Sequence, residues 1–212
     1  MLKVIGIHKC GDIKKNINIG TFIGVIYNEI NNNLNIESNN INNNNNEIKN
    51  NINIIDETKI LNLKEKYLGD EGIQIFNFNN YINIAELDLS GNYITDIKVL
   101  EKVKFNKLEK LYLYANKITN DINILEKFDF KELKELNLSE NQISDIKILE
   151  KVNFKELKKL DLSYNNISDI EVLEKVKFEK LEEMGLTGNE IDLAKNELII
   201  LKLKSLFKRF II

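Results

Sequence analysis

Residues 130–143 read FKELKELNLSENQI, and the spacing within this stretch determines the fold. Its apolar framework, with one Asn, returns four more times between residues 81 and 191. The Asn positions set the phase of the five copies, at intervals of 24, 25, 24 and 24 residues: Asn92, Asn116, Asn141, Asn165 and Asn189. A fixed period of this length indicates an array of stacked units.

Each unit combines two local patterns. The L-x-L portion, residues 136–138 in this copy, has a period of two, which is typical of a short strand. The segment from Ser144 to Val152 has helical spacing, with Ser144 placed as its N-cap. Such a unit cannot bury both of its apolar edges alone, so neighbours must stack. The sequence therefore predicts an α/β solenoid with a short parallel sheet on one face and short helices on the other.

The repeated motif L-x-x-L-x-L-x-x-N-x-I, followed by S/T-D-I-x-x-L, resembles that of the leucine-rich-repeat family. Its short period is most similar to the subclass found in bacterial internalins and in a nuclear phosphatase regulator. The resemblance covers residues 81–194 and implies that the strands line a concave face that binds a protein or peptide. It also implies that each repeated Asn is buried at a turn and bonds backbone groups, with a row of ligand-binding amides as the alternative.

A second once-per-repeat position carries an aromatic residue. Phe105, Phe130, Phe154 and Phe178 recur at fixed phase. This pattern predicts a stacked spine in the core, and an aromatic ligand box is the alternative interpretation.

The rest of the chain divides into four segments. Residues 1–30 have short apolar runs punctuated by glycine, which predict a small β-like segment. Residues 31–53 contain 14 Asn, which is typical of a low-complexity linker, although such tracts also assemble through β-type amide ladders. Residues 54–80 are expected to form a degenerate first repeat or an N-terminal cap. Residues 195–212 are expected to form an amphipathic helix that caps the core.

The C-terminal segment leaves a second function open. Residues 195–212 carry five cations against Glu197 alone, so a helix here could also bind an anionic membrane surface. A membrane-surface adaptor is therefore the alternative function.

Composition argues against several classes of protein. Residues 81–194 hold 17 Lys and 23 acidic residues, a net charge of −6, which disfavours nucleic acid as a partner. One Cys and one His exclude a disulfide scaffold and a conventional Cys/His zinc site, so neither metal nor cofactor is expected. Apolar runs are too short for a membrane span or a secretion signal, so an intracellular, cytoplasmic location is expected.

The sequence gives little support for catalysis. His8 and Cys10 lie close together, but nothing specifies a third group that would orient them as base and nucleophile. No Gly-rich phosphate-binding loop is present. Asp96, Asp145 and Asp169 recur at predicted helix starts, where the helix dipole explains them. The chain is therefore predicted not to be an enzyme.

Function is expected on strand positions that point away from the core. The first such position alternates in charge, which predicts lateral ion pairs between repeats: Glu86, Lys110, Glu135, Lys159 and Glu183. The next positions include three tyrosines, which offer large contact areas with a polar tip. The predicted partner-binding residues are Tyr112, Tyr114, Tyr164, Asp88, Asp161, Glu140 and Asn137, and a merely solvated face is the alternative interpretation.

Overall fold

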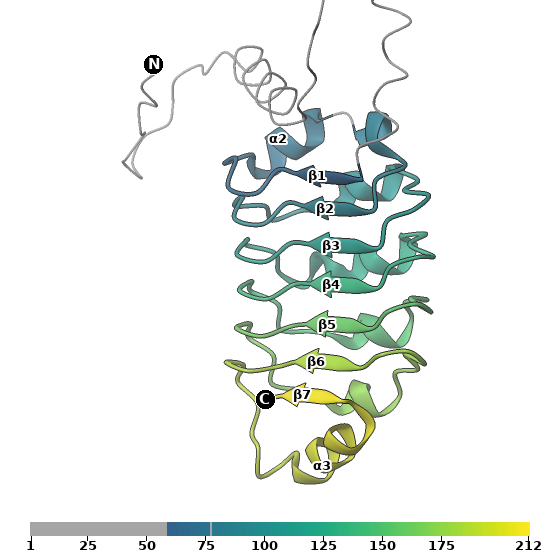
Figure 1. The fold of residues 1–212 in the computed structure, drawn as a ribbon. Helices are drawn as coiled ribbons and strands as arrows, with labels where there is room; N and C mark the ends of the chain where they lie inside the picture. Colours follow the sequence, from purple (N-terminus) through teal and green to yellow (C-terminus); the bar gives the residue numbers. More distant parts are fainter. Residues whose placement is uncertain (1–58, 77) are drawn as a thin grey trace, which may run out of the picture. The chain divides into compact units, whose positions relative to one another are not determined.

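The computed structural model describes residues 59–76 and 78–212, in which short strands alternate with short helical segments (Figure 1). The expectations for residues 1–30 and 31–53, and for His8 and Cys10, lie outside the described residues. Within the described part, seven strands form one parallel sheet in which each strand pairs with its neighbours in the chain. The strands are β1 Ile60–Asn62, β2 Glu86–Asp88, β3 Lys110–Tyr112, β4 Glu135–Asn137, β5 Lys159–Asp161, β6 Glu183–Gly185 and β7 Arg209–Ile211.

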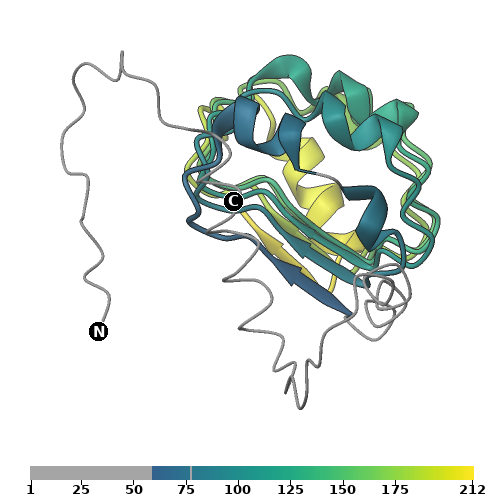
Figure 2. The ribbon, with the colours of Figure 1, turned by 90° about the horizontal axis from the view of Figure 1, so that it is seen from above.

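The sheet lies on one face of the array and the helical segments of the repeats lie on the other, while the C-terminal helix, Glu197–Leu206, lies across the end of the array (Figure 2). These segments are α2 Gly69–Ile75, η2 Phe78–Tyr81, η3 Lys98–Lys102, η4 Asn120–Lys127, η5 Lys147–Glu150, η6 Glu171–Glu174 and α3 Glu197–Leu206. The predicted α/β solenoid is therefore confirmed.

The core lies between the two layers. The middle residue of each strand from β1 to β6 is buried, and so is the apolar residue two positions later, as Leu87 and Leu89 show. Aromatic rings from successive repeats also contact one another, with centroids 6.1 Å apart for Phe105 and Phe130 and 6.4 Å for Phe130 and Phe154. Phe178 is only half-buried, at the end of the series. These contacts support the interpretation of the phenylalanines as a core spine.

One amide in each repeat, buried in all but the last, joins that repeat to its neighbour. Asn141 donates from Nδ2 to the carbonyl oxygens of Leu113 and Leu138, both at 3.0 Å. Its Oδ1 accepts from the backbone N–H of Ile118, also at 3.0 Å. The side chain therefore satisfies backbone groups of two repeats at once. Equivalent bonds are made by Asn92, Asn116, Asn165 and Asn189.

The residue before each of these asparagines has a left-handed backbone, with φ between +53° and +72°. The positions are Gly91, Ala115, Glu140, Tyr164 and Gly188. Only glycine adopts this conformation without a steric cost, which is about 1 kcal/mol or more for other residues. The turn is therefore strained in the three repeats that have Ala115, Glu140 or Tyr164 at this position. In each of them the Asn that follows is directed into the core.

The helical segments within the repeats differ from the sequence prediction. Between Ser144 and Val152 only Lys147–Glu150 is helical, and it is a 3₁₀ turn that is shorter than the predicted helix. The N-terminal N–H of this turn, that of Lys147, donates to Oδ1 of Asp145 at 2.9 Å. The predicted N-cap role of Ser144 is therefore wrong, because the N-cap position is Ile146 and the first N–H of the turn is bound by Asp145. Asp96 and Asp169 accept equivalent bonds, which agrees with a structural role for these carboxylates.

The two ends of the described array differ from each other. At the N-terminal end, Leu61, Leu63 and Leu68 are buried, and the N–H groups of Lys66 and Leu68 donate to Oδ1 of Asn92. This end therefore joins the same amide network without supplying an Asn to it.

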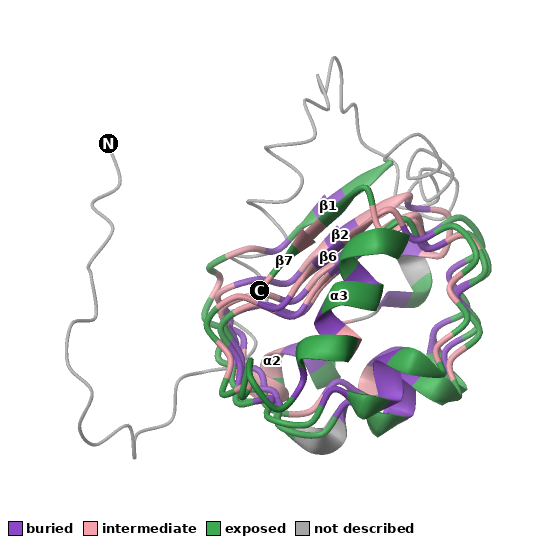
Figure 3. Cartoon of the chain, turned by 90° about the horizontal axis from the view of Figure 1, so that it is seen from below, coloured by how far each residue is buried: buried purple, intermediate pink, exposed green. Residues whose placement is uncertain are grey.

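At the C-terminal end, α3 buries Ile200 and Leu203 but ends at Leu206. The helix predicted through residue 212 is wrong from there on, because residues 209–211 form β7 alongside β6. The backbone N–H of Leu186 donates to the carbonyl of Ile211 at 2.7 Å. The outer side of α3 is exposed (Figure 3). No helix among the described residues has the length and apolar character needed to cross a bilayer.

Replacing Asn165 with Ala should lower the free energy of unfolding by roughly 3 kcal/mol or more, because it leaves buried backbone groups without partners. These groups include the carbonyls of Leu138 and Leu162 and the N–H of Ile143. The side chain of the neighbouring Asn166 is exposed and donates to the carboxylate of Glu190 at 3.3 Å, so Asn166→Ala is a matched control with an expected change within about 0.5 kcal/mol. Urea unfolding followed by circular dichroism measures both changes. Equal losses for the two variants would show that the ladder is not a principal source of stability.

Candidate functional site

Two rows of side chains cross the outer face of the sheet. The first residue of each strand from β2 to β6 belongs to the charge row, which consists of Glu86, Lys110, Glu135, Lys159 and Glu183. The third residue of each strand from β2 to β6 belongs to the central row, which consists of Asp88, Tyr112, Asn137, Asp161 and Gly185. Both rows follow from the parallel register, which places equivalent residues of successive repeats side by side.

The charge row is paired at three of its four steps. Lys110 Nζ lies 3.6 Å from Glu86 and 3.9 Å from Glu135, and Lys159 Nζ lies 3.3 Å from Glu183. No ion pair joins Glu135 to Lys159, although the structure describes both residues. The predicted ladder of ion pairs is therefore interrupted between β4 and β5. In register, Arg209 of β7 extends the alternation beyond Glu183.

A hollow of about 160 Å³ opens where the row is interrupted. Three of the predicted binding residues line it, Tyr112, Asn137 and Asp161. The other lining residues are Glu135, Leu136 and Lys159. The hollow therefore combines an aromatic ring, an amide and charged groups of both signs within three neighbouring strands.

Tyr112 is fixed at one side of this hollow. Its hydroxyl donates to Oε2 of Glu135 at 3.1 Å. Partial burial raises the pKa of Tyr112 well above its ordinary value, and the charge of Glu135 and this hydrogen bond raise it further. The phenol therefore stays protonated and is oriented by Glu135.

The polar side chains of the central row are partly engaged by their own turns. The Oδ1 atoms of Asp88 and Asp161 accept the N–H of Ser90 and Ser163, at 2.9 and 3.0 Å. Asn137 Oδ1 accepts both the N–H and the hydroxyl of Ser139. These bonds fix the side chains and leave the second oxygen of each carboxylate and the Asn137 amide nitrogen with no protein partner among the described residues.

The remaining predicted residues lie outside the hollow. Tyr114 lies beneath Lys64, whose Nζ is 5.0 Å from the ring centroid, and this interaction with Tyr114 is the main cause that raises the pKa of Lys64. Tyr164, which is 59% exposed, and Glu140 occupy left-handed turn positions beyond the strands. Asp88 lies on β2, in register beside Tyr112.

Sequence reasoning missed several contacts among residues that follow the ends of the strands. Lys64 lies in the degenerate first unit, where the motif gives no phase. Tyr67 and Tyr93 stack with centroids 5.9 Å apart, and Lys117 Nζ lies 5.1 Å above the Tyr93 ring. The sequence signal for that pair was available, since Tyr93 and Lys117 each follow a ladder Asn directly.

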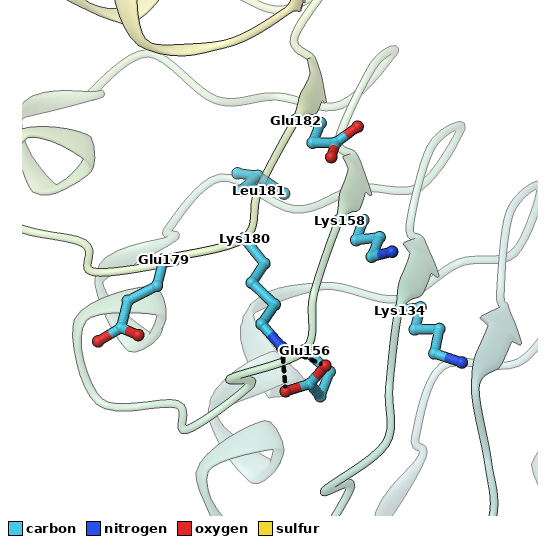
Figure 4. A pocket seen from close by; sticks show the side chains of 7 residues that line it. All are labelled: Lys134, Glu156, Lys158, Glu179, Lys180, Leu181 and Glu182. Carbon is cyan, nitrogen blue, oxygen red and sulfur yellow. Dashed lines mark hydrogen bonds and ion pairs between the residues drawn. The ribbon is translucent and has the colours of Figure 1, made fainter.

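A larger hollow, about 460 Å³, lies among charged residues just before the strands begin (Figure 4). Lys180 Nζ lies 2.7 Å from both carboxylate oxygens of Glu156, and this bond lowers the pKa of Glu156. The lining residues Lys134 and Glu182 are paired with Glu109 and Lys208, each at 2.8 Å. Because most of these charges neutralise one another, this hollow is a weaker candidate than the one at Tyr112. The described residues contain no group of three potential metal ligands.

Comparisons with known proteins agree with this architecture. The family described as Leucine Rich repeats (2 copies) matches residues 131–175. An internalin structure from Listeria monocytogenes is similar with 26% identity and a TM-score of 0.50, over 75% of this chain and 48% of that one. An internalin C2 from the same organism matches with 24% identity and a TM-score of 0.45, over 70% of each chain. No curated protein matches by sequence.

The fold is thus a repeat solenoid with an open sheet face. The phased motif and the family match over residues 131–175 identify leucine-rich repeats in this chain, and the likeness to the internalin agrees with this fold. The chain spans about half the length of the first internalin, which has 48% of its residues covered.

The Tyr112 environment can be tested by titration. The phenolate absorbance of Tyr112 should appear only well above the ordinary tyrosine pKa of 10.0. Glu135→Gln removes a negative charge and should shift this transition to lower pH, and Tyr112→Phe should remove it. Because the folded state holds this proton more tightly than the unfolded state, Tyr112 stabilises the fold at neutral pH, and this contribution is lost as pH rises above 10. An unchanged titration in Glu135→Gln would contradict the hydrogen bond.

Proposed function

We propose that this protein is a non-catalytic interaction module that captures a protein or peptide segment on the outer face of its sheet. The observation that carries the proposal is the hollow at Tyr112, where a half-buried aromatic ring, an amide and a carboxylate meet at a break in the ion-pair row. Aromatic residues with a polar tip are enriched at the energetic centres of protein interfaces.

The rigidity of the face supports this proposal. The side chains on the inner face of the sheet are buried from β1 to β6, and each repeated Asn fixes the turn that follows its strand. A surface that is already ordered loses little conformational entropy when a partner binds. The outward residues vary between repeats while the core positions do not, so the face can be specific without disturbing the fold.

The sheet face suits a slender partner. Neighbouring strands lie about 4.8 Å apart, so the five repeats that carry the motif present a strip only about 25 Å across. A loop, an extended peptide or a single helix fits this strip. The net charge of −6 over residues 81–194 disfavours a nucleic acid, whose phosphates repel an acidic surface.

The alternative of a membrane-surface adaptor has less support. The helix α3 directs Ile200 and Leu203 into the core. Two of the five cations in this segment form ion pairs with the array, Lys202 with Glu174 and Lys208 with Glu182. Leu198, which is 81% exposed, is the feature of α3 that favours a lipid surface most. We therefore place the binding function on the sheet.

Panning a display library of 12-residue peptides against the full chain tests the proposal. Clones retained by the wild type should lose about 30-fold in affinity for a Tyr112→Ala, Tyr114→Ala double variant, because truncating an interface anchor costs about 2 kcal/mol or more. Tyr93→Ala is the matched control, since Tyr93 is an exposed tyrosine outside the two rows. Circular dichroism verifies that each variant is folded. Clones that bind all three proteins equally would overturn the assignment of the sheet face.

A further inference from the structure

The central row holds two carboxylates that the array does not neutralise. Asp88 and Asp161 each have one oxygen bound by a backbone N–H, and neither forms an ion pair within the described part of the chain. The nearby cations of the charge row are engaged elsewhere, Lys110 with Glu86 and Glu135, and Lys159 with Glu183. Lys64, whose pKa the charge of Asp88 helps to raise, is paired with Glu65 at 3.7 Å. Asp88 and Asp161 therefore remain without an ion-pair partner on this face.

The carboxylate of Asp161 also stays accessible because the neighbouring residue in the central row has no side chain. Gly185 follows Asp161 in the row, on the next strand. A Cβ at this glycine would lie 2.6 Å from Asp161 Oδ1 and 2.8 Å from Ser163 Oγ. No side chain therefore covers Asp161 from β6, and the carboxylate stays accessible beside the hollow.

The two carboxylates have a defined separation. The register places Asp88, Tyr112, Asn137 and Asp161 on four successive strands. Three strand spacings amount to about 14 Å, which is also the length of four residues of an extended chain. In an extended chain, residues i, i+2 and i+4 project to the same side. Four residues of a helix span only about 6 Å, so a helical partner would need its basic residues about nine positions apart to match this separation.

The spacing and charges together define a partner. We propose that the sheet face binds an extended peptide that crosses β2 to β5 and carries two basic residues four positions apart. The basic side chains pair with Asp88 and Asp161, and the residue midway between them packs on Tyr112 at the hollow floored by Leu136. This inference rests on the proposed function and adds the chemistry of the partner to it.

A set of fluorescein-labelled nonapeptides tests the inference by anisotropy with the full chain at low salt. The reference probe carries two lysines four positions apart around a central leucine, within serine and glycine. An isomer of the same composition has its lysines three positions apart, and a neutral version has glutamine in place of both lysines. The reference probe should bind about tenfold more tightly than the neutral version and several-fold more tightly than the isomer.

Variants locate the binding and separate the two proposals. Asp88→Asn and Asp161→Asn should each weaken the reference probe by about two- to fivefold and leave the neutral probe unchanged. Asp129→Asn makes the same change of charge at an exposed residue that pairs with Lys131 away from the sheet, and should have no effect. Peptides that bind through Tyr112 without any preference for the lysines or their spacing would overturn this inference and leave the proposed function standing. Binding that survives Tyr112→Ala and both Asp variants would overturn both proposals.

Discussion

The structure depends on the hydrogen bonds of one amide per repeat, which is buried in four of the five repeats. Each repeated Asn donates to carbonyls of its own repeat and the preceding one and accepts a backbone N–H of the preceding one, as Asn165 does with Leu138, Leu162 and Ile143. Without this amide, the turn after each strand would leave buried polar groups unpaired, at a cost of about 1–3 kcal/mol for each. Because the same atom pairs recur, all strands are held in one register. The rows on the sheet face are a consequence of that register.

Because of this register, the residues that stabilise the fold and the residues that can contact a partner occupy different positions of each strand. Inward strand positions are Leu in most repeats, whereas the central row runs through an acid, an aromatic residue, an amide, an acid and a glycine. Exposed ion pairs such as Lys110 with Glu86, at 3.6 Å, contribute little stability by themselves. Their effect on the face is to neutralise charge, whereas Asp88 and Asp161 form no ion pair within the described part of the chain. The binding surface thus derives from the few positions where the pairing is incomplete.

Periodicity was sufficient to predict the framework. The phase of Asn92 to Asn189 located five strands, the buried leucines and the spine of phenylalanines. It failed where tertiary contacts override local preference. Residues 209–211 lie in a segment with helical spacing, yet they become a strand because the edge of β6 offers unpaired backbone groups, such as the N–H of Leu186. The helices of the repeats shortened to 3₁₀ turns because a unit of 24 residues leaves little chain for the return segment.

The alternation of side chains along each strand predicted only part of the candidate site. Alternation along the strand placed Tyr112, Asn137 and Asp161 on one face, and the structure brings them around one hollow. The alternation ends where the backbone becomes left-handed, at Glu140 and Tyr164, so these two side chains lie at turns and not on the sheet face. The contact of Lys64 with Tyr114 spans two repeats, a distance that no local pattern encodes.

Native-state hydrogen exchange tests the central claim, that the Asn ladder holds the array together, most directly. The N–H groups of Ile94, Ile118, Ile143 and Ile167 all donate to a ladder Asn. The account predicts that these four amides exchange most slowly, with similar protection, through opening of the whole array. The amides of Lys98, Lys147 and Glu171, which donate to Asp side chains at the 3₁₀ turns, should exchange faster through local opening. Equal exchange rates for the two groups would contradict the claim.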